Sequence, residues 1–397
     1  MKILHVIASM DPEGGGVSQA VRNIIPELNQ LGVSSVVATL DDPSAIFLGK
    51  DLFPIVALGP SKTSWRYSPK FITYLKDNVS NFTHVIVHGL WQFHGYAVWH
   101  VLRNLRKQTK IETKYYIMPH GMLDPYFQKA PERKFKAIRN LFIWHLFESK
   151  IVNQANGVLF TCETELILAK ETFENYHPKR ELNVSFGIQP PPLKSEVLES
   201  NFYSNFPQLK SKRFILFLGR VDSKKGVDLL IKAYEEVYCK STYQEEIPHL
   251  VIAGPGLETP FGIDLKKMVE ENNKLNNHVI FTGMQKGHEK WTLFYNCEVF
   301  VLPSHQENFG IAVAEAMACK IPVLISNQVN IWREISNSGG GIVANDDLNG
   351  TVEILSKWQK LLPKEKQSMG EKARLCFESQ FSISPAAQKL HQTLLLN

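Results

Sequence analysis

Short apolar runs alternate with longer amphipathic stretches along most of this chain. In the first half, apolar runs typical of buried strands lie at residues 3–8, 35–39, 84–87, 115–118 and 157–160. Between them, apolar positions recur at helical spacing, for example in residues 17–30, 97–106 and 134–147. Strands separated by helices predict a parallel sheet with helices on its faces.

The same alternation restarts in the second half, after a break. The segment Gly187–Leu193 contains three consecutive prolines and cannot continue a sheet, because proline has no N–H to donate. Further strand-like runs follow at 213–218, 250–253, 279–281, 299–302 and 323–325. The domains that we predict are an N-terminal domain (1–187), a linker (188–212), a C-terminal domain (213–378) and a final helix (379–397).

The expected fold class is therefore α/β, with two Rossmann-like doubly wound domains. Ligands of such sheets bind beyond the carboxyl ends of the strands, so two such domains would face each other across a central cleft. Loops that directly follow strand-like runs are thus the first places to look for chemistry.

Composition is that of a globular protein, with 44% hydrophobic and 21% charged residues among 397. No apolar run reaches the roughly 18–20 residues that span a bilayer, and the first eight residues are too short for a signal peptide. Five scattered cysteines without CxxC spacing argue against a disulfide framework and a zinc site. A cytoplasmic location is the simplest expectation. The net charge of +5 permits an anionic substrate or membrane surface, and no basic stripe interleaved with aromatics indicates nucleic-acid binding.

Two glutamates eight positions apart stand out in the second half. Glu307 follows a strand-like run, and Glu315 lies in an alanine-rich stretch that predicts a helix. If the intervening residues are mostly helical, the carboxylates lie about 12 Å apart along the axis, about the reach from a hexose across a diphosphate to a ribose. The amides of Asn308, Phe309 and Gly310 would lie at the helix N-terminus, where phosphate is favoured. The segment predicts a nucleotide-sugar site.

Gly219–Gly226 follows the first strand-like run of the second half and carries Arg220 and Lys225. A guanidinium fork and an ammonium charge together suit a diphosphate, and they would neutralise the charge that builds on it as it leaves. A solvated basic turn is the competing interpretation.

A glycine loop, Gly14, Gly15 and Gly16, precedes the first predicted helix and would let backbone amides approach a ligand. It is not a GxGxxG fingerprint, and a plain strand–helix connection is equally consistent with it. Gly283 and Met284 follow another strand-like run and would hold a base through backbone atoms, although a glycine there is also ordinary turn chemistry.

Two strand-end loops of the first half contain histidine. His120 would contact a sugar hydroxyl or the reacting centre, although a structural histidine is the commoner case. Trp91 and His94 are candidates for the acceptor side, with burial in the core as the alternative.

Residues 129–144 form a basic amphipathic stretch. Phe135, Ile138 and Phe142 fall on one face, with Lys134, Lys136 and Arg139 around the others. Such a stretch suits an anionic lipid surface, but packing of its apolar face on the sheet is the expectation that we favour.

Together these motifs resemble the retaining glycosyltransferases of family four, which have the GT-B fold and act in bacterial polysaccharide biosynthesis. The resemblance covers nearly the whole chain. Its most specific elements are Glu307 with Glu315 and the Gly-Arg-x4-Lys-Gly pattern from Gly219 to Gly226; His120-Gly121 and the first glycine loop also match.

The resemblance implies a role for each matched residue. Glu307 would bind hydroxyls of the donor sugar, Glu315 the ribose, and Arg220 and Lys225 the diphosphate, while His120 would lie beside the transferred sugar. No metal would be bound, and the final helix would return to the first domain. One departure is Phe381-Ser-Ile383, where many members carry a tryptophan.

The function expected from residues and resemblance is transfer of a hexose from a UDP-sugar, UDP-glucose favoured, to a saccharide or lipid-linked saccharide acceptor. The transfer would follow a front-face path, in which the leaving diphosphate helps to deprotonate the acceptor. GDP-mannose is the next donor. A nucleotide-sugar epimerase and a non-catalytic nucleotide-sugar-binding module remain alternatives.

Overall fold

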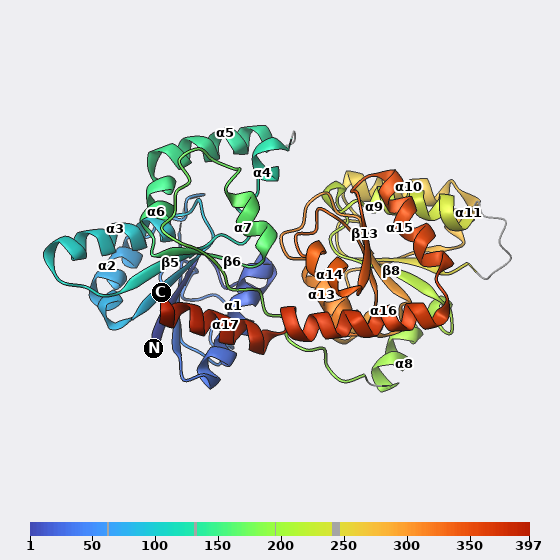
Figure 1. The fold of residues 1–397 in the computed structure, drawn as a ribbon, viewed down its shortest axis with the longest axis horizontal. Helices are drawn as coiled ribbons and strands as arrows, with labels where there is room; N and C mark the ends of the chain where they lie inside the picture. Colours follow the sequence, from blue (N-terminus) through green and yellow to red (C-terminus); the bar gives the residue numbers. More distant parts are fainter. Residues whose placement is uncertain (62, 131–132, 195, 240–246) are drawn as a thin grey trace. The chain divides into compact units, whose positions relative to one another are not determined.

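The chain forms two compact units in the computed structural model, which describes residues 1–397 except 62, 131–132, 195 and 240–246. Unit 1 contains Met1–Gln189 and Ser382–Asn397, and unit 2 contains Pro190–Phe381. Each unit is an α/β layer structure around one parallel sheet (Figure 1). The two-domain Rossmann-like architecture predicted from the sequence is therefore confirmed.

Unit 1 has a seven-stranded sheet in the order β3-β2-β1-β4-β5-β6-β7. Its strands are β1 (Lys2–Ile7), β2 (Ser34–Thr39), β3 (Ile55–Ala57), β4 (His84–His88), β5 (Lys114–Met118), β6 (Gly157–Phe160) and β7 (Glu181–Asn183). Its helices are α1 (Gly16–Gln30), α2 (Pro69–Asn78), α3 (Phe93–Gln108), α4 (Tyr126–Lys129), α5 (Lys134–Ile143), α6 (Ser149–Gln154), α7 (Glu163–Ala169) and α17 (Ile383–Leu396).

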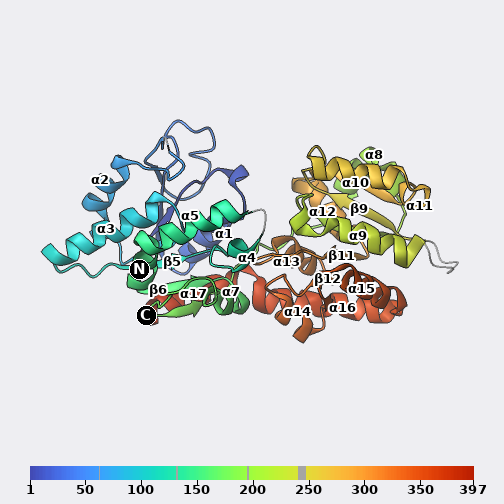
Figure 2. The same ribbon diagram turned by 90° about the horizontal axis from the view of Figure 1, so that it is seen from above.

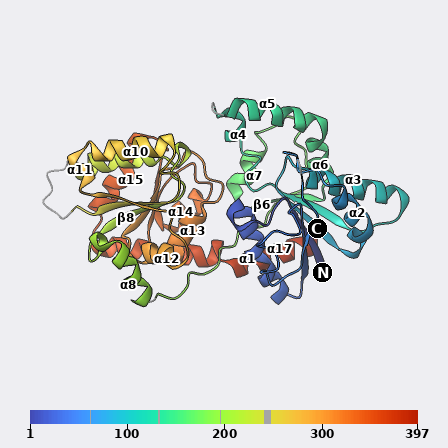
Figure 3. The ribbon, with the colours of Figure 1, turned by 180° about the vertical axis from the view of Figure 1, so that it is seen from behind.

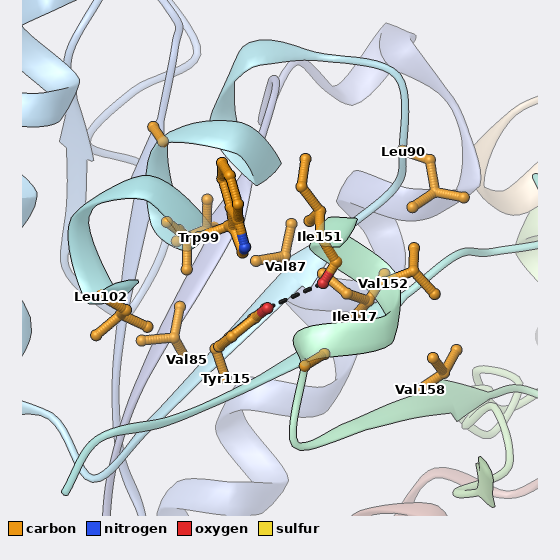
Figure 4. Packing of buried hydrophobic residues seen from close by; sticks show 14 of the residues in the cluster. Val85, Val87, Leu90, Trp99, Leu102, Tyr115, Ile117, Ile151, Val152 and Val158 are labelled. Atoms are coloured by element: carbon orange, nitrogen blue, oxygen red, sulfur yellow. Dashed lines mark hydrogen bonds between the residues drawn. The ribbon is translucent and has the colours of Figure 1, made fainter. Parts of the chain in front are cut away.

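Neighbouring strand residues of this sheet point to opposite faces, and both faces are covered. Tyr115 packs with α3 and α6 on one face, where its hydroxyl donates to the Ile151 carbonyl (2.9 Å; Figure 4). Its neighbour Tyr116 packs on the other face with α1 and α17. A sheet buried on both sides explains why its inner strands are continuous apolar runs in the sequence.

Unit 2 has a six-stranded parallel sheet in the order β10-β9-β8-β11-β12-β13. Its strands are β8 (Phe214–Leu218), β9 (His249–Ala253), β10 (Val279–Gly283), β11 (Val299–Leu302), β12 (Val323–Ser326) and β13 (Gly341–Ala344). Its helices are α8 (Glu196–Asn205), α9 (Val227–Tyr234), α10 (Pro260–Glu270), α11 (Asn273–Asn276), α12 (Gly287–Asn296), α13 (Ile311–Ala318), α14 (Trp332–Ser338), α15 (Leu348–Lys360) and α16 (Pro363–Cys376). Within the unit, α10 and α15 lie along one face of the sheet and α12 and α13 along the other (Figures 1 and 3).

The segment expected to be a linker, 188–212, is largely part of unit 2. Residues from Pro190 onward belong to that unit, and Leu209 is buried in it. The tyrosine hydroxyl of Tyr295 donates to the Pro192 carbonyl (2.5 Å), which ties the proline segment to α12. The last strand of the first sheet ends at Asn183, before the prolines, and the chain after them packs against unit 2. Residue 195 lies outside the described residues.

The C-terminal helix α17 belongs to the first unit. It begins after a π-helical turn (Phe377–Phe381), so the boundary falls between Phe381 and Ser382, three residues after the position expected. Ala387, Leu390 and Leu394 pack against the sheet of unit 1, whose helices are seen from above in Figure 2.

The stretch 129–144 does not pack its apolar face on the sheet, so that expectation is wrong. Phe135 is 91% exposed and Phe142 is 65% exposed. The part at residues 131–132 lies outside the described residues. Helix α5 instead turns inward the side that carries Asn140.

We expect Leu394→Ala to lower the free energy of unfolding of unit 1 by about 2–5 kcal/mol, because it removes a side chain only 1% exposed from a packed core. Urea denaturation measures the change. The matched control is Leu395→Ala, whose side chain is 61% exposed and should alter stability by less than about 0.5 kcal/mol. Equal effects of the two substitutions would contradict the docking of α17.

Candidate functional site

The candidate site in unit 2 lies at the carboxyl ends of β8 and β11, which are neighbours in the sheet. Lys225 is in the loop after β8, and Glu307 is in the loop after β11. The Lys225 ammonium and a Glu307 carboxylate oxygen form an ion pair, and both side chains are mostly buried. The structure thus brings together two residues that sequence motifs 82 positions apart selected separately.

Backbone contacts hold these two loops against each other. The carbonyl of Lys224 accepts from the His305 amide (2.8 Å) and from the Ser304 hydroxyl (3.0 Å). Gly226 has a left-handed backbone (φ 65°), and a Cβ at this position would lie 2.2 Å from the Pro303 carbonyl oxygen. A side chain at 226 would therefore push the loops apart and separate Lys225 from Glu307.

Glu307 does not lie on the helix that carries Glu315. It forms an isolated parallel bridge with Val329: its amide donates to the Gln328 carbonyl, and its carbonyl accepts from the Asn330 amide (both 2.9 Å). Glu307 thus lies in the loop after a strand, as expected, but helix α13 begins only at Ile311, so the separation calculated for one continuous helix does not apply.

The residues between the glutamates reverse the chain before the helix starts. Helix α13 begins at Ile311, and Gly310 caps it with φ 77°. Phe309 is buried, with its ring edge-on to that of Phe381 at 5.5 Å. Asn308 is half-buried in the same loop. A Cβ built on Gly310 would lie 3.5 Å from Cγ of Glu307, so the Glu307 side chain lies beside the residue that caps α13.

Glu315 has a partner that the sequence motifs did not indicate. Lys290, on α12, donates to the Glu315 carboxylate at 2.7 Å, and the glutamate side chain is 12% exposed. Burial raises the pKa of Glu315, and the charge of Lys290 opposes that rise. A separation of 25 residues in the sequence does not predict this ion pair. It follows from the packing of α12 and α13 in the fold.

The loop after β8 carries the strongest positive potential of the site. Burial, followed by repulsion from Lys224, lowers the pKa of Lys225 to about 8, while Asp222 opposes the shift. Arg220 is 69% exposed and makes one long contact with Asp222 (3.4 Å). The lysine is thus fixed, and the arginine can reach toward solvent.

Gly283 and Met284 lie at the same edge of the sheet. Gly283 ends β10 with φ 68°, and its carbonyl accepts from the Gly254 amide at 2.8 Å. Met284 is 55% exposed. Their placement beyond a strand end agrees with the expected position, and their contact with a base stays a prediction.

Unit 1 contains a row of three histidines that crosses adjacent strands. His5 Nδ1 lies 3.1 Å from His88 Nε2, and His88 Nδ1 lies 3.0 Å from His120 Nε2. The rings stack at 5.4 and 5.3 Å between centroids. The row lines a small cavity with Leu390 of α17. The sequence motifs indicated His120 but not His5 or His88, whose alignment follows from the registers of β1, β4 and β5.

The row links the protonation of its members. Burial lowers the pKa of His5 to about 3, that of His120 to about 4 and that of His88 well below its usual value, so all three are neutral at pH 7. A neutral imidazole has one donor and one acceptor nitrogen. If His88 accepts a hydrogen bond from His5, it must donate one to His120, and the reverse also holds. The order of donors and acceptors along the row therefore decides whether Nδ1 of His120 is a donor or an acceptor.

His94 does not fit the expected acceptor side. It is 1% exposed, and its Nε2 bonds the His88 carbonyl at 2.9 Å, so it supports the histidine row from within. Trp91 is half-buried against Phe173 and Trp144, and its amide donates to Glu148 at 3.3 Å. Burial raises the pKa of Glu148 to about 7.

The first glycine loop is shaped by a neighbouring carboxylate. Asp41 accepts from the Met10 amide (2.7 Å) and the Ser9 hydroxyl (2.5 Å), just before Gly14. Gly15 has φ 106° and Gly16 begins α1, so the three glycines lead into a helix N-terminus as expected. Donor contact by Gly14, Gly15 and Gly16 stays a prediction.

Among the described residues, no helix is long and apolar enough to span a membrane. The same part of the chain contains no group of three or more histidine, cysteine, aspartate or glutamate side chains arranged to hold a metal ion.

We expect His5→Leu to change the tautomer populations of His120, although it is His88 that bonds His120. Without its partner, His88 no longer has a fixed donor nitrogen, and His120 loses the tautomer imposed on it. Ring ¹⁵N chemical shifts measure this directly. His84→Leu is the control, because His84 lies on β4, the strand that carries His88, but outside the row. Unchanged His120 shifts in His5→Leu would show that the row does not couple the tautomers.

Comparison with known proteins agrees with this geometry. Residues 201–375 match the family of glycosyl transferases group 1. An uncharacterized glycosyltransferase of Methanocaldococcus jannaschii is 31% identical over 163 residues, 40% of each chain. O-antigen chain mannosyltransferase C of Escherichia coli is 21% identical over 100% of this chain and 99% of its own.

Solved structures share the whole fold. Sucrose-phosphate synthase from Thermosynechococcus elongatus has a TM-score of 0.76 at 19% identity and covers 100% of this chain and 99% of its own. HepE of Anabaena, solved in complex with UDP, has a TM-score of 0.75 at 15% identity, with full coverage of both chains. The architecture is therefore GT-B, and residues 201–375 form a domain of the glycosyl transferases group 1 family.

Proposed function

We propose that this chain transfers a hexose, glucose favoured, from a UDP-sugar to a hydroxyl of a polysaccharide or lipid-linked saccharide acceptor, with retention of configuration. The observation that carries the proposal is the Lys225–Glu307 pair at the ends of two adjacent strands. The pair places an ammonium group, which would bind a diphosphate, beside a carboxylate, which would accept hydrogen bonds from sugar hydroxyls.

The pair would exchange partners when a donor binds. A diphosphate carries more negative charge than one carboxylate and would draw the Lys225 ammonium toward it. Glu307 would then accept hydrogen bonds from hydroxyls of the donor sugar. Exposed Arg220 would close on the same diphosphate, and the amides of Asn308, Phe309 and Gly310 would face its distal phosphate.

Glu315 would hold the ribose from the far side of the loop. Its carboxylate keeps an acceptor oxygen for a hydroxyl while Lys290 holds the side chain in place. The distance between the sugar and the ribose is thus set by one loop and the first turns of α13 rather than by a continuous helix.

In the reaction, the bond between the anomeric carbon and the diphosphate oxygen would break, and the bond to the acceptor oxygen would form on the same face. The acceptor proton would pass to the departing diphosphate. Positive charge from Lys225 and Arg220 would stabilise that leaving group, and we propose that no metal is needed. The role of His120 beside the transferred sugar, and its own contribution to rate, stays a prediction.

The relatives support the class of acceptor and leave the donor to experiment. Their names include an O-antigen chain mannosyltransferase and a lipopolysaccharide N-acetylglucosaminetransferase, both enzymes of surface polysaccharides. HepE was solved with UDP-glucose, which supports a UDP-sugar here, with GDP-mannose as the competing donor. We propose a cytoplasmic enzyme that meets its acceptor at the inner face of the membrane.

A thermal-shift screen over UDP-, GDP- and ADP-sugars tests the donor, because a ligand that binds the native state raises its stability. We expect UDP-glucose to give the largest shift. Turnover of the donor in the absence of any acceptor would instead indicate an epimerase. Binding without turnover on any saccharide or lipid acceptor would indicate a binding module.

Two substitutions distinguish the binding of the diphosphate by Lys225 from the binding of the sugar by Glu307. Lys225→Met should weaken UDP binding about 10- to 100-fold, since it removes a charge-assisted contact. Glu307→Ala should lower turnover about 100-fold or more, while UDP affinity stays equal or rises because the competing carboxylate is gone. Calorimetry and initial rates measure both.

The matched control is Lys232→Met, which removes a lysine from a surface ion pair on α9 and should leave both quantities unchanged. Near-normal turnover of Glu307→Ala would rule out its assigned role. Unchanged UDP affinity of Lys225→Met would do the same for the lysine.

Affinity for UDP should fall as the pH rises through about 8, the pKa of Lys225 in the donor-free chain. Diphosphate binds the charged lysine, and the neutral form grows above that pH. The decline should approach about tenfold per pH unit. Calorimetry between about pH 7 and pH 9 measures it, and Lys225→Met should give a flat profile. A flat profile in the unaltered protein would contradict the assignment.

A further inference from the structure

Helix α5 presents an apolar face to solvent. Its exposed apolar residues, with that of the turn after it, are Phe135 (91%), Ile138 (67%), Leu141 (47%), Phe142 (65%) and Leu146 (51%). We call these five the outer face of α5. The helix runs along the upper margin of unit 1 in Figures 1 and 3. Monomeric proteins rarely expose so many large apolar side chains together, so the face calls for a partner.

The helix cannot bury this face by rotating about its axis, because the opposite side is already packed against the rest of unit 1. At 3.6 residues per turn, Ile138, Phe142 and Phe135 fall within an arc of about 60°, and Asn140 and Trp144 lie opposite. Asn140 and Trp144 are buried, and the Trp144 ring stacks on Phe173 at 4.6 Å while its N–H donates to the Glu174 carbonyl. These contacts fix which side of α5 faces outward.

The charged residues of α5 itself are all positive. Lys134 and Arg139 flank the apolar arc on its two sides, and Lys136 and Lys150 are exposed nearby. From 133 to 150 the one acidic residue is Glu148, which is buried. An apolar stripe between basic residues is the pattern of a helix that lies in the interface of an anionic bilayer, with lysine stems reaching toward headgroups.

We propose that the outer face of α5 docks on the surface of an anionic lipid bilayer, with the helix axis parallel to the membrane and the phenylalanines inserted below the headgroups. A second copy of this chain fits less well, since a symmetric contact would bring the lysines of both copies together. The face follows a single helix, and fluid lipid can cover such a face without a preformed groove. The proposal adds a named surface to the proposed membrane acceptor but does not rest on it.

Co-sedimentation with lipid vesicles tests this without donor or acceptor, so its result is independent of the proposed reaction. The full chain should sediment with vesicles of phosphatidylglycerol and phosphatidylcholine and remain in solution with phosphatidylcholine alone. Phe135→Ser combined with Ile138→Ser and Phe142→Ser should abolish binding. Lys134→Gln with Arg139→Gln should weaken it, by roughly fivefold for each charge removed.

The control is a triple variant, Ile46→Ser, Leu52→Ser and Leu193→Ser, which removes apolar side chains of similar exposure elsewhere. It should bind vesicles as the unaltered chain does. Because all six side chains are exposed, both triple variants should keep their melting temperature, which shows that they fold.

Three results would overturn the proposal. The first is a chain that stays in solution with anionic vesicles, and the second is a serine variant of α5 that binds them normally. The third is a dimer in sedimentation velocity that the same variant dissociates, which would assign the outer face to a second copy.

Discussion

The position of Gly226 against the Pro303 carbonyl is the contact on which the candidate site depends. Parallel strands bring their carboxyl ends to one edge of a sheet, but that alone leaves the loops of β8 and β11 several ångströms of freedom. The missing side chain at 226 lets the two backbones touch, and the Lys224 carbonyl then accepts two hydrogen bonds from the opposite loop. Only with the loops in contact does Lys225 reach Glu307. The charge arrangement is a consequence of backbone packing, not of attraction between two mobile side chains.

Two mostly buried ion pairs of unit 2, Lys225 with Glu307 and Lys290 with Glu315, lie where the proposed donor would bind. The first pair would meet the diphosphate and the sugar, and the second would meet the ribose. Desolvation disfavours an isolated buried ion, as the lowered pKa of Lys225 and the raised pKa of Glu315 show. The charge of Lys290 opposes the rise in the pKa of Glu315, so this ion pair lowers the cost of burying the carboxylate.

The inner strands could be predicted from the sequence, whereas three of the four edge strands were missed. The strands that the apolar runs missed are β3, β7 and β13, and each lies at an edge of its sheet. Their residues are half-buried and two of these strands are very short: Ile55–Ala57 is an apolar run of only three residues, and Glu181–Asn183 contains a single apolar residue. The motifs located Lys225, Glu307 and Glu315, since loops after strands are fixed by the fold. The pairing of Lys290 with Glu315 and the contacts of His5 and His88 in the histidine row were missed. They depend on which strands and helices become neighbours, and the sequence motifs carry no signal of that.

Helix α5 shows a related limit of periodicity. An apolar stripe at helical spacing predicts that one face of a helix is covered, but it does not say by what. The stripe of α5 was expected against the sheet, where most such stripes lie. The side that packs is instead marked by Asn140 and Trp144, two residues that can bury polar atoms because their hydrogen bonds are met within the protein. With the inner side satisfied in this way, the phenylalanines on the other side have no protein core left to join. They remain available to a partner outside the fold, such as the proposed lipid surface.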